Sequence, residues 1–228
     1  MVRPPAFLRA LSRKFPNRDI AALERMRARG SNLVVLQPWT FSTEDRYPAL
    51  FDALAERLAH SPEPRVLSFG CAGGEEVRAL RRRLPHATVV GVDVNPRALD
   101  RARRRDRDPR SRYLIGDRPP PGEPFHAVLA LAVFRHGALE RNHISSSAEL
   151  MPFGRAAEAF ARLDAALKPG GVLAWGNAHV RLADLPNGGS YVLEAAFDAP
   201  APSCWLYAPD NRLLAGASEA GGLYRKRA

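Results

Sequence analysis

Short apolar runs alternate with amphipathic helical patterns along most of the chain. Residues 66–69 form an almost continuous apolar run that breaks at Gly70, and a helical pattern with Val77 and Leu80 on its apolar face follows. Further apolar runs, each typical of a buried strand, occupy residues 88–93, 112–117, 125–134 and 172–177. The repeated order of strand, turn and helix predicts an α/β protein with a mostly parallel, doubly wound sheet.

The N-terminal quarter of the chain has a different pattern. Asn17 can cap a helix that ends before Gly30, residues 33–41 are extended and apolar, and a second amphipathic helix follows. We therefore expect residues 1–62 to form a helical cap or lid and residues 63–228 to form the sheet domain.

The composition is typical of one globular domain in a reducing compartment. The 228 residues are 46% hydrophobic and 25% charged, and the two cysteines, Cys71 and Cys204, cannot form a disulfide framework. No apolar run approaches the roughly 18 residues of a membrane-spanning helix, and the first residues lack the apolar segment of a secretory signal. We expect a cytoplasmic protein with no membrane partner.

The net charge of +10 is concentrated in two parts of the chain. Residues 1–30 carry eight basic and two acidic side chains, and residues 97–118 carry nine basic and four acidic ones. Of the 34 basic residues, 31 are arginine, whose planar guanidinium suits carboxylates and phosphates. These patches either bind an acidic partner such as a nucleic acid or form solvated helix faces, which the interleaved aspartates favour.

The turn between the first strand and its helix carries the first chemical signal. A dinucleotide site needs the spacing Gly-x-Gly-x-x-Gly, but here the glycines stand at 70, 73 and 74. Glu75 and Glu76 then open the helix, where two carboxylates would repel a diphosphate and attract a cation. S-adenosylmethionine, which has a sulfonium, an ammonium and no phosphate, suits this pattern. The alternative is a tight turn that binds no ligand.

The second strand ends in Asp93, which lies 19 residues after Gly74. Folds of this kind place a carboxylate about 20 residues past the glycine-rich turn, where it accepts hydrogen bonds from ribose hydroxyls. With this acid, residues 46–180 resemble the class I S-adenosylmethionine-dependent methyltransferases. The turn at residues 68–76 is most similar to that of the chemoreceptor glutamate methyltransferases and their relatives.

The resemblance implies a Rossmann-like, mostly parallel sheet of seven strands, closed by a C-terminal antiparallel hairpin in the strand-like pieces 191–197, 204–207 and 223–225. The helix at 153–167, followed by Lys-Pro-Gly-Gly and a strand, matches the same passage of the family. The implied cofactor is S-adenosylmethionine, and no metal is implied. The expected cofactor-binding residues are Gly70, Cys71, Ala72, Gly74, Glu75, Asp93, Val94, Asp117, Arg118 and Leu131.

Residues for catalysis and for the acceptor are harder to assign. His136 follows the fourth strand and, with an ordinary pKa of about 6.5, could deprotonate an acceptor hydroxyl, or it could position the acceptor or lie on the surface. Trp39 and Phe41 precede the first strand, in a region that in the family often covers the cofactor, so they are expected to contact the acceptor unless they only pack a helix on the sheet. His143 lies in a polar loop, residues 140–147, that is long enough to cover an acceptor.

The implied reaction is an in-line displacement at a methyl carbon that positive sulfur already activates, so the protein mainly aligns the acceptor and excludes water. We expect methyl transfer to an oxygen or nitrogen of a small-molecule acceptor, which the arginines would suit if it is acidic. The alternative is methylation of RNA or of a protein carboxylate through the basic surface. Residues 131–134, Leu-Ala-Val-Phe, lack the Asn/Asp-Pro-Pro-Tyr/Phe motif of amino-group methylases of bases and glutamine. A non-catalytic cofactor-binding protein or a nicotinamide enzyme is the third class.

Overall fold

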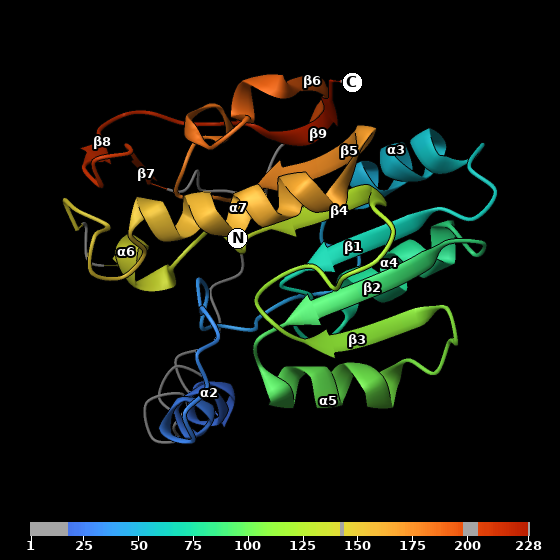
Figure 1. Cartoon of the computed structure of the whole chain (residues 1–228), viewed down its shortest axis with the longest axis horizontal. Helices are drawn as coiled ribbons and strands as arrows, with labels where there is room; N and C mark the ends of the chain where they lie inside the picture. The colour runs from blue at the N-terminus through green and yellow to red at the C-terminus, as the bar shows by residue number, and fades with distance from the viewer. Residues whose placement is uncertain (1–17, 142–143, 198–204, 228) are drawn as a thin grey trace, which may run out of the picture.

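The computed structural model describes residues 18–141, 144–197 and 205–227. Within these ranges seven strands form one sheet in the order β3-β2-β1-β4-β5-β9-β6 (Figure 1). Their bounds are β1 Arg65–Phe69, β2 Thr88–Asp93, β3 Ser111–Ile115, β4 Phe125–Leu131, β5 Leu167–Gly176, β6 Tyr191–Phe197 and β9 Gly221–Lys226. Strands β1 to β5 run parallel, whereas β9 pairs antiparallel with both β5 and β6. The predicted fold class is confirmed.

The antiparallel part of the sheet is more elaborate than a hairpin. Two very short strands, β7 (Leu206–Tyr207) and β8 (Leu213–Leu214), pair with each other in the connection between β6 and β9. Of the strand expected at 204–207, Cys204 lies outside the described residues, and β7 covers the end of the range.

Helices cover both faces of the sheet (Figure 1). Their bounds are α2 Arg18–Ala28, α3 Pro48–Leu58, α4 Glu75–Arg83, α5 Pro96–Arg105, α6 Gly137–Arg141 and α7 Phe153–Ala166, with 3-10 turns η1 Leu182–Asp184 and η2 Gly188–Ser190. On one face Leu54 of α3 and Leu80 of α4 share a core with Val66, and on the other Phe160 of α7 packs in a second core with Leu67. Successive strand residues point to opposite faces, which is why neighbours in β1 belong to different cores.

Three boundaries differ from the sequence-based expectation. Strand β5 begins at Leu167, so the Lys-Pro-Gly-Gly passage lies inside the strand, where Gly170 takes a φ of +72° and the ladder to β4 shifts register. Phe125 to Ala127 advances two positions along β4 while Leu167 to Val172 advances five along β5, so β5 bulges by three residues there. Strand β4 ends at Leu131, three residues early, and Ala132 turns the chain away with a φ of +60°. Helix α6 occupies the start of the expected polar loop.

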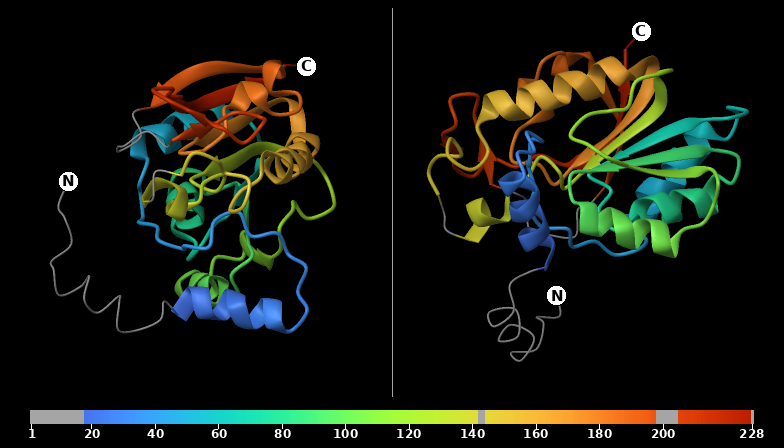
Figure 2. Two further views of the ribbon diagram at one scale, coloured as in Figure 1. Left: turned by 90° about the vertical axis from the view of Figure 1, so that its left-hand side faces the viewer. Right: turned by 60° about the horizontal axis from the view of Figure 1, so that its bottom comes forward.

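The N-terminal region packs against the sheet domain in two ways. Helix α2 contacts α5 (Figure 2), and α3 contacts α4, β6 and β9. Between α2 and α3 the chain forms an extended strap, defined as residues 33–41, which has no strand partner among the described residues. Leu36 of the strap is buried in the same core as α7. The domain boundary at residue 62 stays a prediction.

A polar cluster around Asp19 fixes the strap. The Asp19 carboxylate accepts hydrogen bonds from both terminal nitrogens of Arg101, at 2.7 and 2.8 Å, and from the Thr40 hydroxyl. The backbone carbonyl of Asp19 accepts a hydrogen bond from the Asn95 side chain at 3.0 Å. Burial alone would raise the pKa of Asp19, but the hydrogen bonds from Arg101 and Thr40 outweigh it and lower the pKa. The cluster therefore ties α2 and the strap to α5 as an ion pair.

Among the helices that the structure describes, none is both long enough and apolar enough to cross a lipid bilayer.

Candidate functional site

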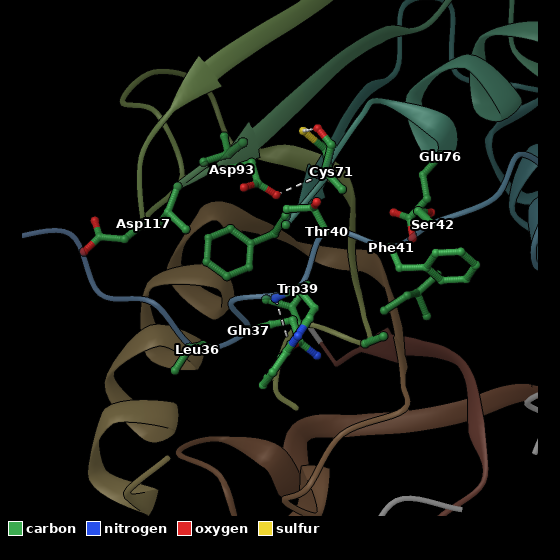
Figure 3. Close-up of a pocket in the computed structure, with 18 of the residues that line it drawn as sticks. Leu36, Gln37, Trp39, Thr40, Phe41, Ser42, Cys71, Glu76, Asp93 and Asp117 are labelled. Atoms are coloured by element: carbon green, nitrogen blue, oxygen red, sulfur yellow. Dashed lines mark hydrogen bonds between the residues drawn. The ribbon is translucent and has the colours of Figure 1, made fainter. Parts of the chain in front are cut away.

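A pocket of about 790 Å³, partly open to solvent, lies where β1, β2 and β4 end (Figure 3). Strand β1 lies between β2 and β4. The order of the strands therefore runs outward from β1 toward one edge of the sheet through β2 and β3, and toward the other edge through β4 and β5. Open α/β sheets bind their ligands at such a switch point, beyond the carboxyl ends of the strands. The turn after β1 forms one wall and the strap forms the opposite wall, so the pocket has the position of a ligand site.

The turn after β1 is shaped by two residues with positive φ, Gly70 at +74° and Ala72 at +47°. The backbone nitrogens of Gly70 and Cys71 donate hydrogen bonds to the Val92 carbonyl, at 2.7 and 3.1 Å, and so hold the turn on β2. Gly70, Cys71 and Ala72 all line the pocket. Burial raises the pKa of the Cys71 thiol well above its ordinary value, so this side chain lines the pocket as a small neutral group.

The next two residues of the predicted set lie away from the pocket. Gly74 takes a φ of +79° before α4, and a Cβ there would lie 2.7 Å from the Tyr113 hydroxyl oxygen, on the side of α5 and β3. The Glu75 carboxylate lies 3.7 Å from an Arg78 nitrogen and 3.6 Å from an Arg105 nitrogen. Neither Gly74 nor Glu75 is among the residues that line the pocket.

Asp93 lies at the centre of the pocket wall (Figure 3). Its carboxylate accepts hydrogen bonds from the backbone nitrogens of Ala72 and Asn95, both at 2.8 Å. Burial raises its pKa, although both hydrogen bonds favour the charged form. The carboxylate thus stabilises the turn and has lone pairs left for hydroxyl donors of a ligand.

Glu76 faces the pocket, at the other end from Asp117 (Figure 3). Its buried carboxylate accepts a hydrogen bond from the Ser68 hydroxyl at 2.9 Å. Burial raises the pKa of Glu76 to about 7. A buried carboxylate whose described hydrogen-bond partner is a neutral hydroxyl is suited to a cationic ligand group, which would stabilise its ionised form.

The carboxylate of Asp117 already accepts hydrogen bonds from other residues of the protein. Its carboxylate accepts a hydrogen bond from the backbone nitrogen of Val34 in the strap, at 3.0 Å, and one from the exposed Arg118 side chain, also at 3.0 Å. Burial would raise the pKa of Asp117, but these two hydrogen bonds outweigh it and lower the pKa. Asp117 lines the pocket with Val94 and Leu131, whereas Arg118 lies outside the lining.

A second cavity, of about 890 Å³ and open to solvent, adjoins the first. The two share Trp39 and Phe41 of the strap, together with Gln37, Arg46 and Ala132. The remaining lining residues of the second cavity are Arg135, from the segment between β4 and α6, and Gly137 and Glu140 of α6. The two aromatic residues expected to contact an acceptor therefore stand between the two cavities.

The two histidines of the predicted site differ in outcome. His136 lies against Trp39 with ring centroids 5.2 Å apart in an edge-to-face arrangement, and its carbonyl faces a ring nitrogen of His179 at 3.2 Å. His136 is absent from the lining of both cavities, whereas Trp39 lines both. His143 lies outside the described residues. Within the described ranges no group of three His, Cys, Asp or Glu side chains could hold a metal ion.

Comparisons with known proteins agree with this geometry. A family model described as a methyltransferase domain matches residues 67–173. An uncharacterized methyltransferase of Synechocystis sp. is 27% identical over 190 residues, which cover 80% of this chain and 73% of that protein. A trans-aconitate 2-methyltransferase of Acidovorax sp. is 30% identical over 134 residues, which cover 59% of this chain. This chain spans 45% of that protein's length.

The fold agrees as well. The solved structure of the N-methyltransferase NodS from Bradyrhizobium japonicum has a TM-score of 0.51 at 17% identity, over 81% of this chain and 98% of that one. The chain is therefore similar to methyltransferases in sequence over residues 67–173 and in its overall fold. The matched segment contains the turn after β1, Asp93, Asp117 and Leu131, the residues at which S-adenosylmethionine is expected to bind.

The lining residues of the first cavity fit that cofactor better than a dinucleotide. Three carboxylates, of Glu76, Asp93 and Asp117, face one arginine, Arg46, among the charged residues that line the first cavity. A pocket with an excess of acids disfavours a diphosphate and favours a sulfonium and an ammonium group. Glu76 is the member of this set absent from the predicted cofactor-binding residues, and no spacing rule distinguishes it from Glu75.

Proposed function

We propose that this protein transfers a methyl group from S-adenosylmethionine to an oxygen or nitrogen of a small-molecule acceptor. The observation that carries the proposal is the pair of adjoining cavities, one at the cofactor turn and one beyond it, which share Trp39, Phe41 and Ala132. Such a pair offers one compartment to the donor and one to the acceptor. The strap and α6 wall the second compartment, as an acceptor of limited size requires.

Each of the three carboxylates of the first cavity would bind a different part of S-adenosylmethionine. Asp93 would accept hydrogen bonds from the ribose hydroxyls, Asp117 would face the adenine amino group, and Glu76 would pair with the ammonium. The order of these residues along the pocket, from Asp117 through Asp93 to Glu76, supports this assignment (Figure 3). Gly70 and Leu131 would lie against the cofactor as close-packed backbone.

S-adenosylmethionine supplies a methyl carbon whose bond to sulfur breaks as the bond to the acceptor forms, with the electron pair left on sulfur. The chain itself needs to hold the acceptor in line and to keep water out. Trp39 and Phe41 are placed to contact the acceptor, because they line the boundary of the cavities. A role of His136 as general base stays a prediction, since His136 lines neither cavity.

A labelling experiment tests the acceptor class. The protein is incubated with S-adenosylmethionine carrying a tritiated methyl group and with a cell extract divided into small-molecule, RNA and protein fractions. We expect label in the small-molecule fraction, and we expect it to disappear when the protein is boiled beforehand. Label in RNA, or base-labile label in protein, would instead support methylation through the basic surface and contradict the proposal.

Glu76 provides a test of the cofactor assignment through pH. Because its pKa is about 7 in the free protein, affinity for S-adenosylhomocysteine should rise as pH increases from 6 to 8 and the carboxylate ionises to meet the ammonium. Glu76→Gln should weaken binding at pH 8 by about 1.5–3 kcal/mol, the value of a hydrogen bond to a charged group. It should also flatten the pH dependence in isothermal titration calorimetry.

The stability of the free protein should show the opposite trend. A folded-state pKa raised above the ordinary 4.5 contributes stability at low pH that is lost as pH rises through about 7. Glu76→Gln should therefore lose less stability than the wild type between pH 6 and 8. Glu75→Gln is the matched variant, since its side chain lies away from the pocket. Equal effects of both variants on affinity would refute the assignment of Glu76.

A further inference from the structure

We propose that the second cavity binds an acceptor that carries a carboxylate, and that Arg46 is the residue that holds this carboxylate. The proposal deepens the proposed function and rests on it, because it names the chemical class of the acceptor for the same site. It starts from one observation: Arg46 lines both cavities, at the boundary between donor and acceptor.

Arg46 is held in place by its neighbour. Its guanidinium carbon lies 5.4 Å from the centroid of the Tyr47 ring, within the range of a cation–π contact. Tyr47 is buried, directly precedes α3, and accepts a hydrogen bond from the Asn177 side chain at 2.5 Å. The Arg46 side chain is half-buried. The charge is therefore presented on a fixed support, and less entropy is lost when it binds a ligand.

The acids that stand nearest to Arg46 in the sequence are paired with other arginines. Glu44 accepts a hydrogen bond from Arg78 at 2.5 Å, and Asp45 accepts one from Arg83 at 2.6 Å. Among the described residues no carboxylate lies within ion-pair distance of Arg46. A half-buried guanidinium without an acidic partner is an exception in this chain, because most arginines around the site are paired.

The other charges of the second cavity cancel each other. Arg135 and Glu140 form an ion pair with one another. With Arg46, the described lining of the second cavity carries one positive charge in excess. This charge favours an anionic acceptor over a neutral or cationic one. Glu76 lies in the first cavity and attracts Arg46 from there, but its carboxylate is assigned to the cofactor ammonium.

The geometry of the remaining lining defines the rest of the acceptor. A guanidinium presents parallel N–H donors that match the two oxygens of a carboxylate. Trp39 and Phe41 add aromatic faces beside it, and the Phe41 side chain is 82% exposed at the rim. An acceptor with a carboxylate at one end and a planar or apolar body would use both features. A relative named for methylating trans-aconitate, itself a carboxylate, is consistent with this class.

The experiment measures binding to the protein saturated with S-adenosylhomocysteine, by ligand-observed NMR titration. The probes are benzoate and trans-aconitate, each compared with an uncharged counterpart, benzamide and the trimethyl ester of trans-aconitate. We expect at least one carboxylate to bind and its counterpart to bind at least tenfold more weakly. Arg46→Gln should weaken carboxylate binding about tenfold or more, and Arg46→Lys, which keeps the charge but loses the fork, should weaken it less.

Arg104→Gln is the matched control. Arg104 is exposed on α5 and lies outside both cavities, so this variant removes the same charge without touching the site, and it should leave carboxylate binding unchanged. Equal effects of Arg46→Gln and Arg104→Gln would overturn the proposal. So would a failure of both carboxylates to bind, or equal binding of charged and uncharged probes.

The cofactor has a carboxylate of its own, which is the second source of the same chemistry. Affinity for S-adenosylhomocysteine and for the same compound lacking its carboxylate is therefore measured with both variants. If Arg46→Gln weakens binding of S-adenosylhomocysteine but not binding of the compound without the carboxylate, Arg46 holds the carboxylate of the cofactor and the proposal is overturned. If the wild type does not bind S-adenosylhomocysteine at all, the proposed function fails too, which distinguishes that failure from one confined to Arg46.

Discussion

Replacing Gly70 with alanine should lower the free energy of unfolding by about 2–5 kcal/mol and abolish cofactor binding. Gly70 has a φ of +74°, and a Cβ at this position would lie 2.3 Å from Cγ2 of Val133. The positive φ costs an L-residue about 1–2 kcal/mol, and overpacking against a stiff, buried valine adds about 1–3 kcal/mol. Both residues line the pocket, so the strain would be relieved by a shift of its wall.

Two further variants separate these causes in chemical denaturation. Gly70→Ala with Val133→Ala removes the clash but keeps the unfavourable φ, so it should recover part of the stability. Gly154→Ala adds the same methyl group in α7, where nothing lies within 4 Å and the backbone is helical, and it should be neutral or stabilising by about 0.5–1 kcal/mol. A Gly70→Ala protein as stable as the wild type would show that the turn is misdescribed.

The second large effect is expected at Asp93. Asp93→Ala should weaken binding of S-adenosylhomocysteine by about 1–3 kcal/mol, or roughly 5- to 150-fold, because ribose hydroxyls and the backbone nitrogens of Ala72 and Asn95 all lose an acceptor. Calorimetry gives the affinity, and thermal unfolding without ligand shows how much of the loss comes from the turn itself.

The control for Asp93→Ala is Asp100→Ala. The Asp100 side chain is exposed on α5 and lies 3.4 Å from an Arg103 nitrogen, so its removal should change neither affinity nor stability by more than about 0.5 kcal/mol. If Asp93→Ala binds the cofactor as tightly as Asp100→Ala, the ribose assignment is wrong.

The parts of the fold that could be predicted from the sequence are those in which apolar residues recur with the period of a strand or a helix. The buried run of β1, the turn at Gly70 and the acid at the end of β2 each follow from local chemistry, and together they locate the pocket. The parallel direction of β1 to β5 also follows from the alternation of strands and amphipathic helices.

The choice between Glu75 and Glu76 could not be made in the same way. Consecutive residues on a helix point about 100° apart, so one carboxylate faces the pocket and the other faces Arg78 and Arg105. Which of the two side chains faces the pocket depends on how α4 is rotated against the sheet. Two consecutive glutamates at the start of the helix do not reveal that rotation.

Residues in irregular segments were missed for a different reason. Arg46 stands in the loop between the strap and α3, where no periodicity applies, and it reaches the site through the tertiary arrangement. The bond between the Val34 nitrogen and Asp117 spans 83 positions of the chain, so the fixing of the strap by this acid could not be read from its neighbours in sequence. For His136 the position after the fourth strand was predicted, although β4 ends three residues earlier than expected, and the contact of its ring with Trp39 was not predicted.

The most direct test of the account is the nucleotide selectivity of the pocket at the ends of β1 and β2. Isothermal titration calorimetry of the wild-type protein with S-adenosylhomocysteine and, separately, with NAD compares a ligand with an ammonium group to one with a diphosphate. Three carboxylates and a single arginine in the described lining predict one site for S-adenosylhomocysteine and no measurable binding of NAD. Binding of NAD without binding of S-adenosylhomocysteine would contradict it.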